Sequence, residues 1–293
     1  MKGTRLLIAA VVLASLLLPG VAGAAGVFDN LVLSPRARAM GGAFVALSDD
    51  ETAVFTNPAA LSMQDEIGFY SSYVDLYGYD FLTLGSGAVS VPTDYGTFGV
   101  GVRYLATEYG GAELEKEYTV TVGHGVVLME DVHSSLAVGY GLNLFGLSFP
   151  TETVGGTDLG SANTFGLDIG VLGTLRGRTR FGFFVKNINN PKLGDPDAKD
   201  LPQWFTAGVS YSPYGGVHTS LEVQKQTHED IRACFGLEME VNEYLTLRGG
   251  IQNQPNRISF GFGTGWKMVR LDYSFTTHET LPGSHVYGLG ITF

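Results

Sequence analysis

Apolar and polar residues alternate along most of the chain from residue 67 onward. In RISFGFGTGW at 257–266, Ile258, Phe260 and Phe262 fall on one face, with serine and glycine at the positions between them. A period of two that is sustained over about eight to ten residues indicates a β-strand. Strands of globular proteins typically have about 5 to 6 residues, whereas about 9 to 11 residues cross a bilayer when the strand is tilted.

This alternation predicts an all-β protein with fourteen strands. They occupy residues 67–76, 81–91, 97–106, 116–128, 133–147, 163–175, 179–188, 203–212, 217–226, 230–241, 244–252, 257–265, 268–276 and 285–293. A bacterial membrane barrel made of one chain has an even number of strands. The connections after odd-numbered strands are longer on average than those after even-numbered strands. Outer-membrane barrels show the same difference between their outer loops and their periplasmic turns.

The two faces of the predicted strands differ in polarity. One face is continuously apolar and suits lipid, whereas the other carries small polar residues with isolated charges and suits a narrow lumen. The charged side chains expected in the lumen are Arg103, Asp168, Lys186, Glu222, Arg232, Glu238, Arg248, Arg270 and Asp272. Candidates for aromatic girdles at the membrane interfaces are Tyr70, Tyr104, Tyr118, Phe145, Phe181, Trp204, Tyr211 and Trp266. A soluble β-sandwich also alternates, but its exposed face carries Lys and Glu freely.

Composition agrees with a membrane barrel. Charged residues make up 16% of the chain, whereas soluble domains carry about 25%. The net charge of −11 argues against nucleic acid as a partner. The single cysteine, Cys234, excludes an intrachain disulfide framework. By register it falls on the lumen face.

The first residues resemble a secretory leader. Lys2 and Arg5 precede an apolar run from Leu6 to Leu18, and small residues follow at 22–24. The apolar run is shorter than the roughly 20 residues that span a bilayer, so a cleaved signal peptide is favoured over a retained anchor helix. We therefore expect a signal peptide at 1–24, an N-terminal segment at 25–66 and a barrel at 67–293.

The stretch PRARAMGGAFVALSDDETAVFTNPAAL at 35–61 is the least regular part of the chain. A phosphate loop is excluded because no Lys-Ser or Lys-Thr follows the glycines. The consecutive acids at 49–51 do not have the alternating spacing of a calcium loop. Ser48 with Glu51 instead fits a capping box that opens a helix over 49–55. Asn57 followed by Pro58 fits the cap and first position of a second helix.

The glycines at 41 and 42 permit a tight turn or a close approach to a wall. Two short helices and a turn cannot span a membrane, but they can fold back into a lumen. The fold class expected is therefore a transmembrane antiparallel β-barrel of about 14 strands with a short helical N-terminal hatch in its lumen. The residues that define this hatch motif are Met40, Gly41, Gly42, Asp49, Asp50, Asn57 and Pro58.

Residues 36–61 resemble the amino-terminal signature of FadL-like outer-membrane barrels, and most closely the PorV/PorQ family. Weaker similarities are found in VKNINNPKLG at 185–194, LPQWFTAGVSY at 201–211, LTLRGGI at 245–251 and LDYSF at 271–275. The resemblance implies a fourteen-stranded barrel with an N-terminal hatch that has no catalytic role. It also implies a location in the outer membrane of a Gram-negative-type bacterium.

Three kinds of function follow. The first is a plugged channel or binding barrel for small hydrophobic solutes. The second, implied by the PorV branch, is an accessory barrel that binds exported proteins in a type IX-like secretion system, with loops 148–162 and 189–202 as the contact surface. The third is an outer-membrane enzyme, which the sequence disfavours because its six histidines are scattered and no metal or cofactor motif is found.

The chain ends in SHVYGLGITF, which alternates up to a terminal Phe293. This ending resembles the signal by which outer-membrane barrels are recognised for insertion. The expected partners are therefore outer-membrane lipid and the barrel-assembly machinery, together with hydrophobic ligands or secreted proteins.

Overall fold

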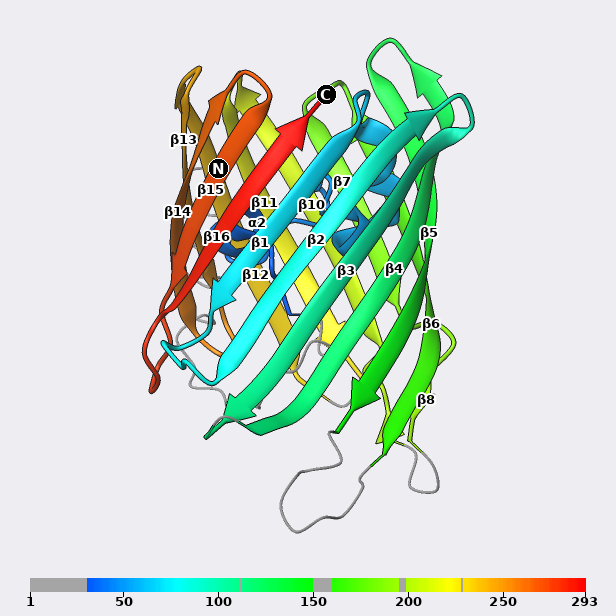
Figure 1. Ribbon diagram of the computed structural model, residues 1–293. Coiled ribbons are helices and arrows are strands. Elements are labelled where there is room, and N and C mark those ends of the chain that lie inside the picture. Colours follow the sequence, from blue (N-terminus) through cyan, green and yellow to red (C-terminus); the bar gives the residue numbers. More distant parts are fainter. Residues whose placement is uncertain (1–30, 111, 150–159, 195–198, 228) are drawn as a thin grey trace.

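A computed structural model describes residues 31–110, 112–149, 160–194, 199–227 and 229–293. Within these residues, fourteen strands form one closed antiparallel barrel in which each strand pairs with its neighbours in sequence (Figure 1). The predicted fold class and strand number are therefore confirmed. The predicted signal peptide lies outside the described residues.

The barrel strands have nearly the bounds that alternation predicts. They are β1 Gly68–Asp75, β2 Leu82–Thr93, β3 Gly96–Tyr109, β4 Ala112–Asp131, β5 Ser134–Ser148, β6 Ser161–Leu175, β7 Thr179–Lys186, β10 Trp204–Tyr214, β11 Val217–Gln226, β12 Ile231–Asn242, β13 Leu245–Gln252, β14 Arg257–Trp266, β15 Val269–Thr276 and β16 Ser284–Thr292. β16 pairs with β1 and closes the barrel, with Tyr287 opposite Tyr73.

Strand register separates an apolar outer face from a packed interior. Phe260 in β14 is 58% exposed, whereas its neighbour Ser259 is 1% exposed. Tyr118, Phe181, Tyr211 and Trp266 are likewise exposed on the outside. Three of the predicted girdle residues are misplaced, because Tyr70, Phe145 and Trp204 are buried inside the barrel. Their register puts them on the lumen face, and proximity to a strand end did not reveal this.

The two ends of the barrel differ in the length of their connections. At the end that holds the start of β1 and the end of β16, two or three residues join each pair of strands, as between β2 and β3. The opposite end holds the longer connections, although β3 and β4 are also joined there by only two residues. The one from β7 to β10 contains a small hairpin, β8 Lys192–Leu193 with β9 Lys199–Asp200. Leu193 and Leu201 of this connection pack on Phe145, so it folds inward over the lumen.

Residues 31–66, called here the internal segment, lie inside the barrel (Figure 1). The segment contains two short helices, α2 Pro35–Ala39 and α3 Ala53–Thr56, and a 3-10 helix, η1 Pro58–Met63. α2 packs against β13 to β16, and η1 packs against β3 to β6. The segment therefore reaches opposite sides of the wall. Within the described residues, no helix has the length and apolar character needed to cross a membrane.

One of the two predicted helix caps is wrong. α3 begins at Ala53 after Thr52, which makes no side-chain cap, and Ser48 Oγ hydrogen-bonds the Thr56 hydroxyl instead of a backbone N–H. Glu51 has a stronger partner in an arginine of the wall, so no capping box forms. Asn57 does cap η1, because its Oδ1 accepts the N–H of Ala59 at 3.2 Å.

Candidate functional site

The barrel wall is fitted to the internal segment by glycines. A Cβ on Gly250 would overlap the backbone of Met40 and Gly41, and a Cβ on Gly139 would overlap Pro58 and Ala59. Gly182 meets the backbone of Val45 in the same way. These wall positions admit no side chain while the segment is in place. The glycines of the lumen face therefore make room for the segment, and the space is filled.

Gly41 and Gly42 place the segment directly on the wall. Their φ angles are +65° and +85°, a region that other residues rarely adopt. A Cβ on Gly41 would lie 2.7 Å from the backbone nitrogen of Ile251. A Cβ on Gly42 would lie 3.6 Å from Cys234 Sγ. Met40, which precedes them, is fully buried.

Arg36 of α2 joins the internal segment to the wall through ion pairs. Its Nε and one terminal nitrogen each donate to Glu238 at 2.8 Å, and its other terminal nitrogen lies 2.6 Å from Asp49 and 3.4 Å from Asp50. Asp49 also accepts from Arg180 at 2.8 Å. Burial raises the pKa of the Asp49 carboxyl, but Arg36 and Arg180 outweigh burial and hold that pKa below its usual value.

The same network continues along the wall. Arg248 donates to Glu238 at 2.7 Å and to Asp272 at 2.6 Å. Arg270 donates to Asp272 at 3.1 Å and returns to the internal segment at Glu51, 3.0 Å away. Burial raises the pKa of Glu51, and Arg270 only partly opposes this effect. Acids and arginines thus alternate along one continuous chain of charges.

Two further contacts hold the middle of the segment. Glu222 Oε2 accepts the backbone N–H groups of Phe44 and Val45 at 2.7 and 2.6 Å. Asn57 Nδ2 donates to the carbonyl oxygens of Val45 and Val171 at 2.9 and 3.2 Å. A wall carboxylate and a segment amide therefore satisfy backbone groups that burial would otherwise leave unpaired.

The remaining lumen charges lie away from the ion-pair network. Asp168 accepts from Asn143 Nδ2 at 2.7 Å, and Lys186, which is fully buried, acts on it electrostatically. Arg232 lies over the Trp204 ring at 5.2 Å and donates from Nε to a backbone carbonyl. Arg103 lies over the Phe55 ring at 5.1 Å.

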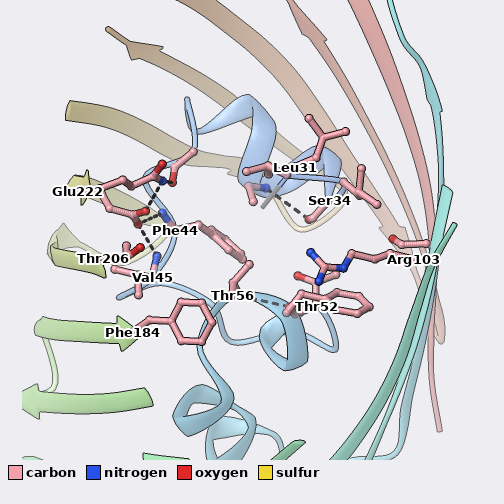
Figure 2. Close-up of a pocket in the computed structure, with 17 residues that line it drawn as sticks. Leu31, Ser34, Phe44, Val45, Thr52, Thr56, Arg103, Phe184, Thr206 and Glu222 are labelled. Atoms are coloured by element: carbon pink, nitrogen blue, oxygen red, sulfur yellow. Dashed lines mark hydrogen bonds between the residues drawn. The ribbon is translucent and has the colours of Figure 1, made fainter. Parts of the chain in front are cut away.

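A cavity that opens in part to solvent lies between the internal segment and the wall (Figure 2). Its apolar lining includes Phe44 and Phe55 from the segment and Phe184 from β7. Arg103 and Glu222 contribute charged groups from different parts of the wall (Figure 2). An apolar pocket with a few polar groups is typical of a small-molecule site.

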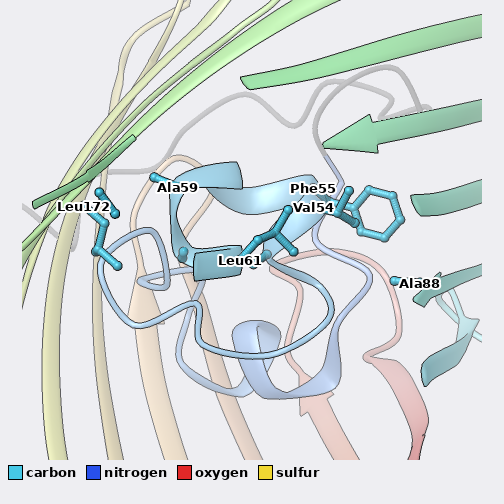
Figure 3. Packing of buried hydrophobic residues seen from close by; sticks show 9 residues of the cluster. Val54, Phe55, Ala59, Leu61, Ala88 and Leu172 are labelled. Atoms are coloured by element: carbon cyan, nitrogen blue, oxygen red, sulfur yellow. The ribbon is translucent and has the colours of Figure 1, made fainter. Parts of the chain in front are cut away.

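An apolar cluster that includes residues of α3 and η1 packs the segment against the wall (Figure 3). Val54, Phe55 and Leu61 are buried there against Ala88 and Leu172 of the barrel. Wall glycines again make the fit possible, because a Cβ on Gly99 would contact Leu61 and Val54 at 3.0 to 3.2 Å. The segment is thus held by apolar packing as well as by charge.

Sequence reasoning did not single out Arg36, Arg180 or Glu51 as site residues. Arg36 and Glu51 lie beside residues of the hatch motif, and charges in a buried segment require partners, which is the signal that could have found them. Phe293 is exposed at the end of the chain, and its N–H donates to the carbonyl of Ile67 at 2.9 Å. In the described residues, no group of three or more metal-ligating side chains comes together.

Several solved structures share this fold. The toluene transporter TodX of P. putida matches with a TM-score of 0.63 and 15% identity, over 89% of this chain and 98% of that chain. The toluene transporter TbuX of Ralstonia pickettii matches with a TM-score of 0.60 and 15% identity, over 91% and 100%. A FadL homologue of Pseudomonas aeruginosa matches with a TM-score of 0.54 and 13% identity, over 88% and 96%.

No protein-family model matches the chain, and no curated protein matches it. At these identities the structural matches establish a shared barrel fold. The chain therefore has the barrel fold of these three proteins.

Proposed function

We propose that the protein is an outer-membrane channel barrel for small hydrophobic solutes, and that its internal segment is a hatch. The observation that carries the proposal is the partly apolar cavity between the segment and the wall of a barrel with an apolar outer face. A solute bound in this cavity contacts the segment and the wall together. Movement of the segment would therefore change both the cavity and the path through the lumen.

The comparisons support this proposal through the named roles of proteins that have the same fold. Two of the barrels are described as toluene transporters. The phenylalanines that line the cavity here suit a flat apolar solute. A location in the outer membrane of a Gram-negative-type bacterium, reached after cleavage of the predicted signal peptide, is part of the same proposal.

The segment has the contacts expected of a hatch that is closed at rest. Ion pairs at Arg36 and Glu51, the hydrogen bonds of Glu222, and the apolar cluster at Leu61 hold it across the lumen. Polar contacts of this kind can be exchanged for water when the segment moves, whereas the hydrogen bonds between the strands of the wall stay intact. The lumen would then open without unfolding of the barrel.

Uptake by liposomes that contain the purified barrel tests the proposal. We expect the full-length protein to admit toluene and to exclude a small sugar, and a variant that lacks residues 31–66 to admit both. Absence of toluene uptake by correctly folded full-length protein contradicts the proposed function. If the deletion variant does not fold, Arg36→Ala, which loosens the segment without removing it, should raise sugar leakage.

The accessory-barrel alternative stays a second hypothesis. In the described part of the β7–β10 connection, Leu193 and Leu201 pack inward on Phe145, whereas Ile188 is exposed. Membership of the PorV/PorQ family, and insertion through the strand that ends at Phe293, stay predictions.

A further inference from the structure

Arg103 lacks the acidic partner that Arg36 and Arg248 possess. Arg103 is 3% exposed, and its Nε has no hydrogen-bond partner among the described residues. Its guanidinium carbon lies 5.1 Å from the centre of the Phe55 ring. A buried guanidinium keeps its proton, and an unpaired buried charge is costly. The charge therefore lies in the cavity without compensation from a paired carboxylate.

The acids nearest to Arg103 are already engaged. Asp168 acts on Arg103 electrostatically, but its oxygens accept from Asn143 Nδ2 at 2.7 Å and from the Asn187 N–H at 2.8 Å. Glu222 lies on another part of the cavity wall (Figure 2) and accepts from two backbone N–H groups and from Gln224. Asp168 acts on Lys186 as well as on Arg103, so one carboxylate faces two cations. An anion from outside would therefore complete the site.

We propose that the cavity binds a small aromatic carboxylate, with the carboxylate on Arg103 and the ring among Phe44, Phe55 and Phe184. This inference rests on the proposed function, since it names the class of solute. A planar guanidinium matches a carboxylate in geometry, and the three phenylalanines offer apolar faces to a ring.

Charge separates this solute class from neutral hydrocarbons. A neutral ring fills the apolar part of the cavity but leaves Arg103 unpaired, whereas a carboxylate on the same ring pairs with it. The carboxylate should therefore bind more tightly than a neutral ring of the same shape.

Calorimetric titration of the purified full-length barrel with benzoate and with benzamide, its neutral analogue, tests this inference. We expect benzoate to bind about tenfold or more tightly, which is the effect of one hydrogen-bonded charge pair. Arg103→Gln should remove the preference and leave benzamide binding in place, and Arg103→Lys should retain part of it. Arg257→Gln is the matched control, because Arg257 lies in the lumen but does not line the cavity. This variant should keep the full preference.

Equal binding of benzoate and benzamide to the wild type overturns the inference, as does a preference that survives in folded Arg103→Gln. Octanoate, an aliphatic carboxylate, should bind more weakly than benzoate, and tighter binding overturns the assignment to an aromatic ring. If Arg103→Gln does not fold, the wild-type ratio and Arg103→Lys still decide. Toluene uptake without any preference for benzoate leaves the proposed function standing and this inference refuted. Absence of both refutes both.

Discussion

Arg36 of the internal segment binds both carboxylate oxygens of Glu238 on the barrel wall, with each N–O distance at 2.8 Å. The two residues are 202 positions apart in the sequence. Such a two-pronged pair fixes direction as well as distance. It links α2 of the segment to β12 of the wall.

Arg36→Ala should loosen the segment. Removal of one partner leaves Glu238 and Asp49 buried with fewer counter-charges, and breaking a buried pair typically costs about 3 to 5 kcal/mol. We expect higher single-channel leakage in planar bilayers and faster proteolysis of the segment. Lys192→Ala, which breaks the exposed pair with Asp200, is the control and should change neither measurement. Unchanged leakage in Arg36→Ala would show that this ion pair does not keep the segment in place.

Acid should weaken the segment through Asp49. Its pKa is lowered in the folded protein from an ordinary value of 3.8. Its stabilising contribution is therefore complete above that ordinary value and is lost as pH falls through the lowered pKa. Leakage should accordingly rise below about pH 4 in the wild type. In Asp49→Asn that step should be smaller, whereas Asp94→Asn in the exposed β2–β3 turn should keep it. An identical acid profile in Asp49→Asn contradicts this assignment.

Gly41→Ala should displace the segment from β13. Alanine at φ +65° is strained, and its Cβ would lie 2.7 Å from the nitrogen of Ile251. We expect the free energy of local opening of the segment to fall by about 1 to 3 kcal/mol. Hydrogen exchange of the backbone amides of residues 31–66 measures this free energy. Gly173→Ala is the matched control, since a Cβ there meets nothing within 4 Å. If the amides of Gly41→Ala are protected as well as those of the wild type, Gly41 does not lie closely against the backbone of Ile251.

A single engineered cysteine should lock the segment reversibly. Gly42→Cys would place its Cβ 3.6 Å from the sulfur of Cys234, which is the chain's single native cysteine. Oxidation should then block toluene uptake, and reduction should restore it. Gly42→Cys combined with Cys234→Ser controls for the strain at φ +85°. Uptake by the fully oxidised protein would show that solutes pass without movement of this part of the segment.

The sequence predicts the barrel well because register is a local property. Alternation alone locates the strands, and the same alternation assigns residues such as Glu238 and Asp272 to the inside, where the structure buries them. The length asymmetry of the connections also follows from the chain itself. These features need no knowledge of distant contacts.

The pairing inside the lumen could not be predicted in the same way. Arg36 meets Glu238, and Arg270 meets Glu51, across about two hundred residues, and no local pattern specifies such partners. The same limit explains why the predicted capping box does not form. Glu51 pairs with Arg270, which is distant in the sequence, instead of with the start of the helix. The buried position of Tyr70, in contrast, follows from the alternation of β1, which is local.

The glycines of the wall have one further consequence. Gly250, Gly139 and Gly182 leave room for the backbone of this particular segment, so the inner surface of the barrel is complementary in shape to it. A segment transplanted from a barrel of the same architecture would carry bulk and charge to positions where no recess or counter-charge awaits them. Segment and wall are thus constrained to change together, and chimeras should work only when both halves come from one parent.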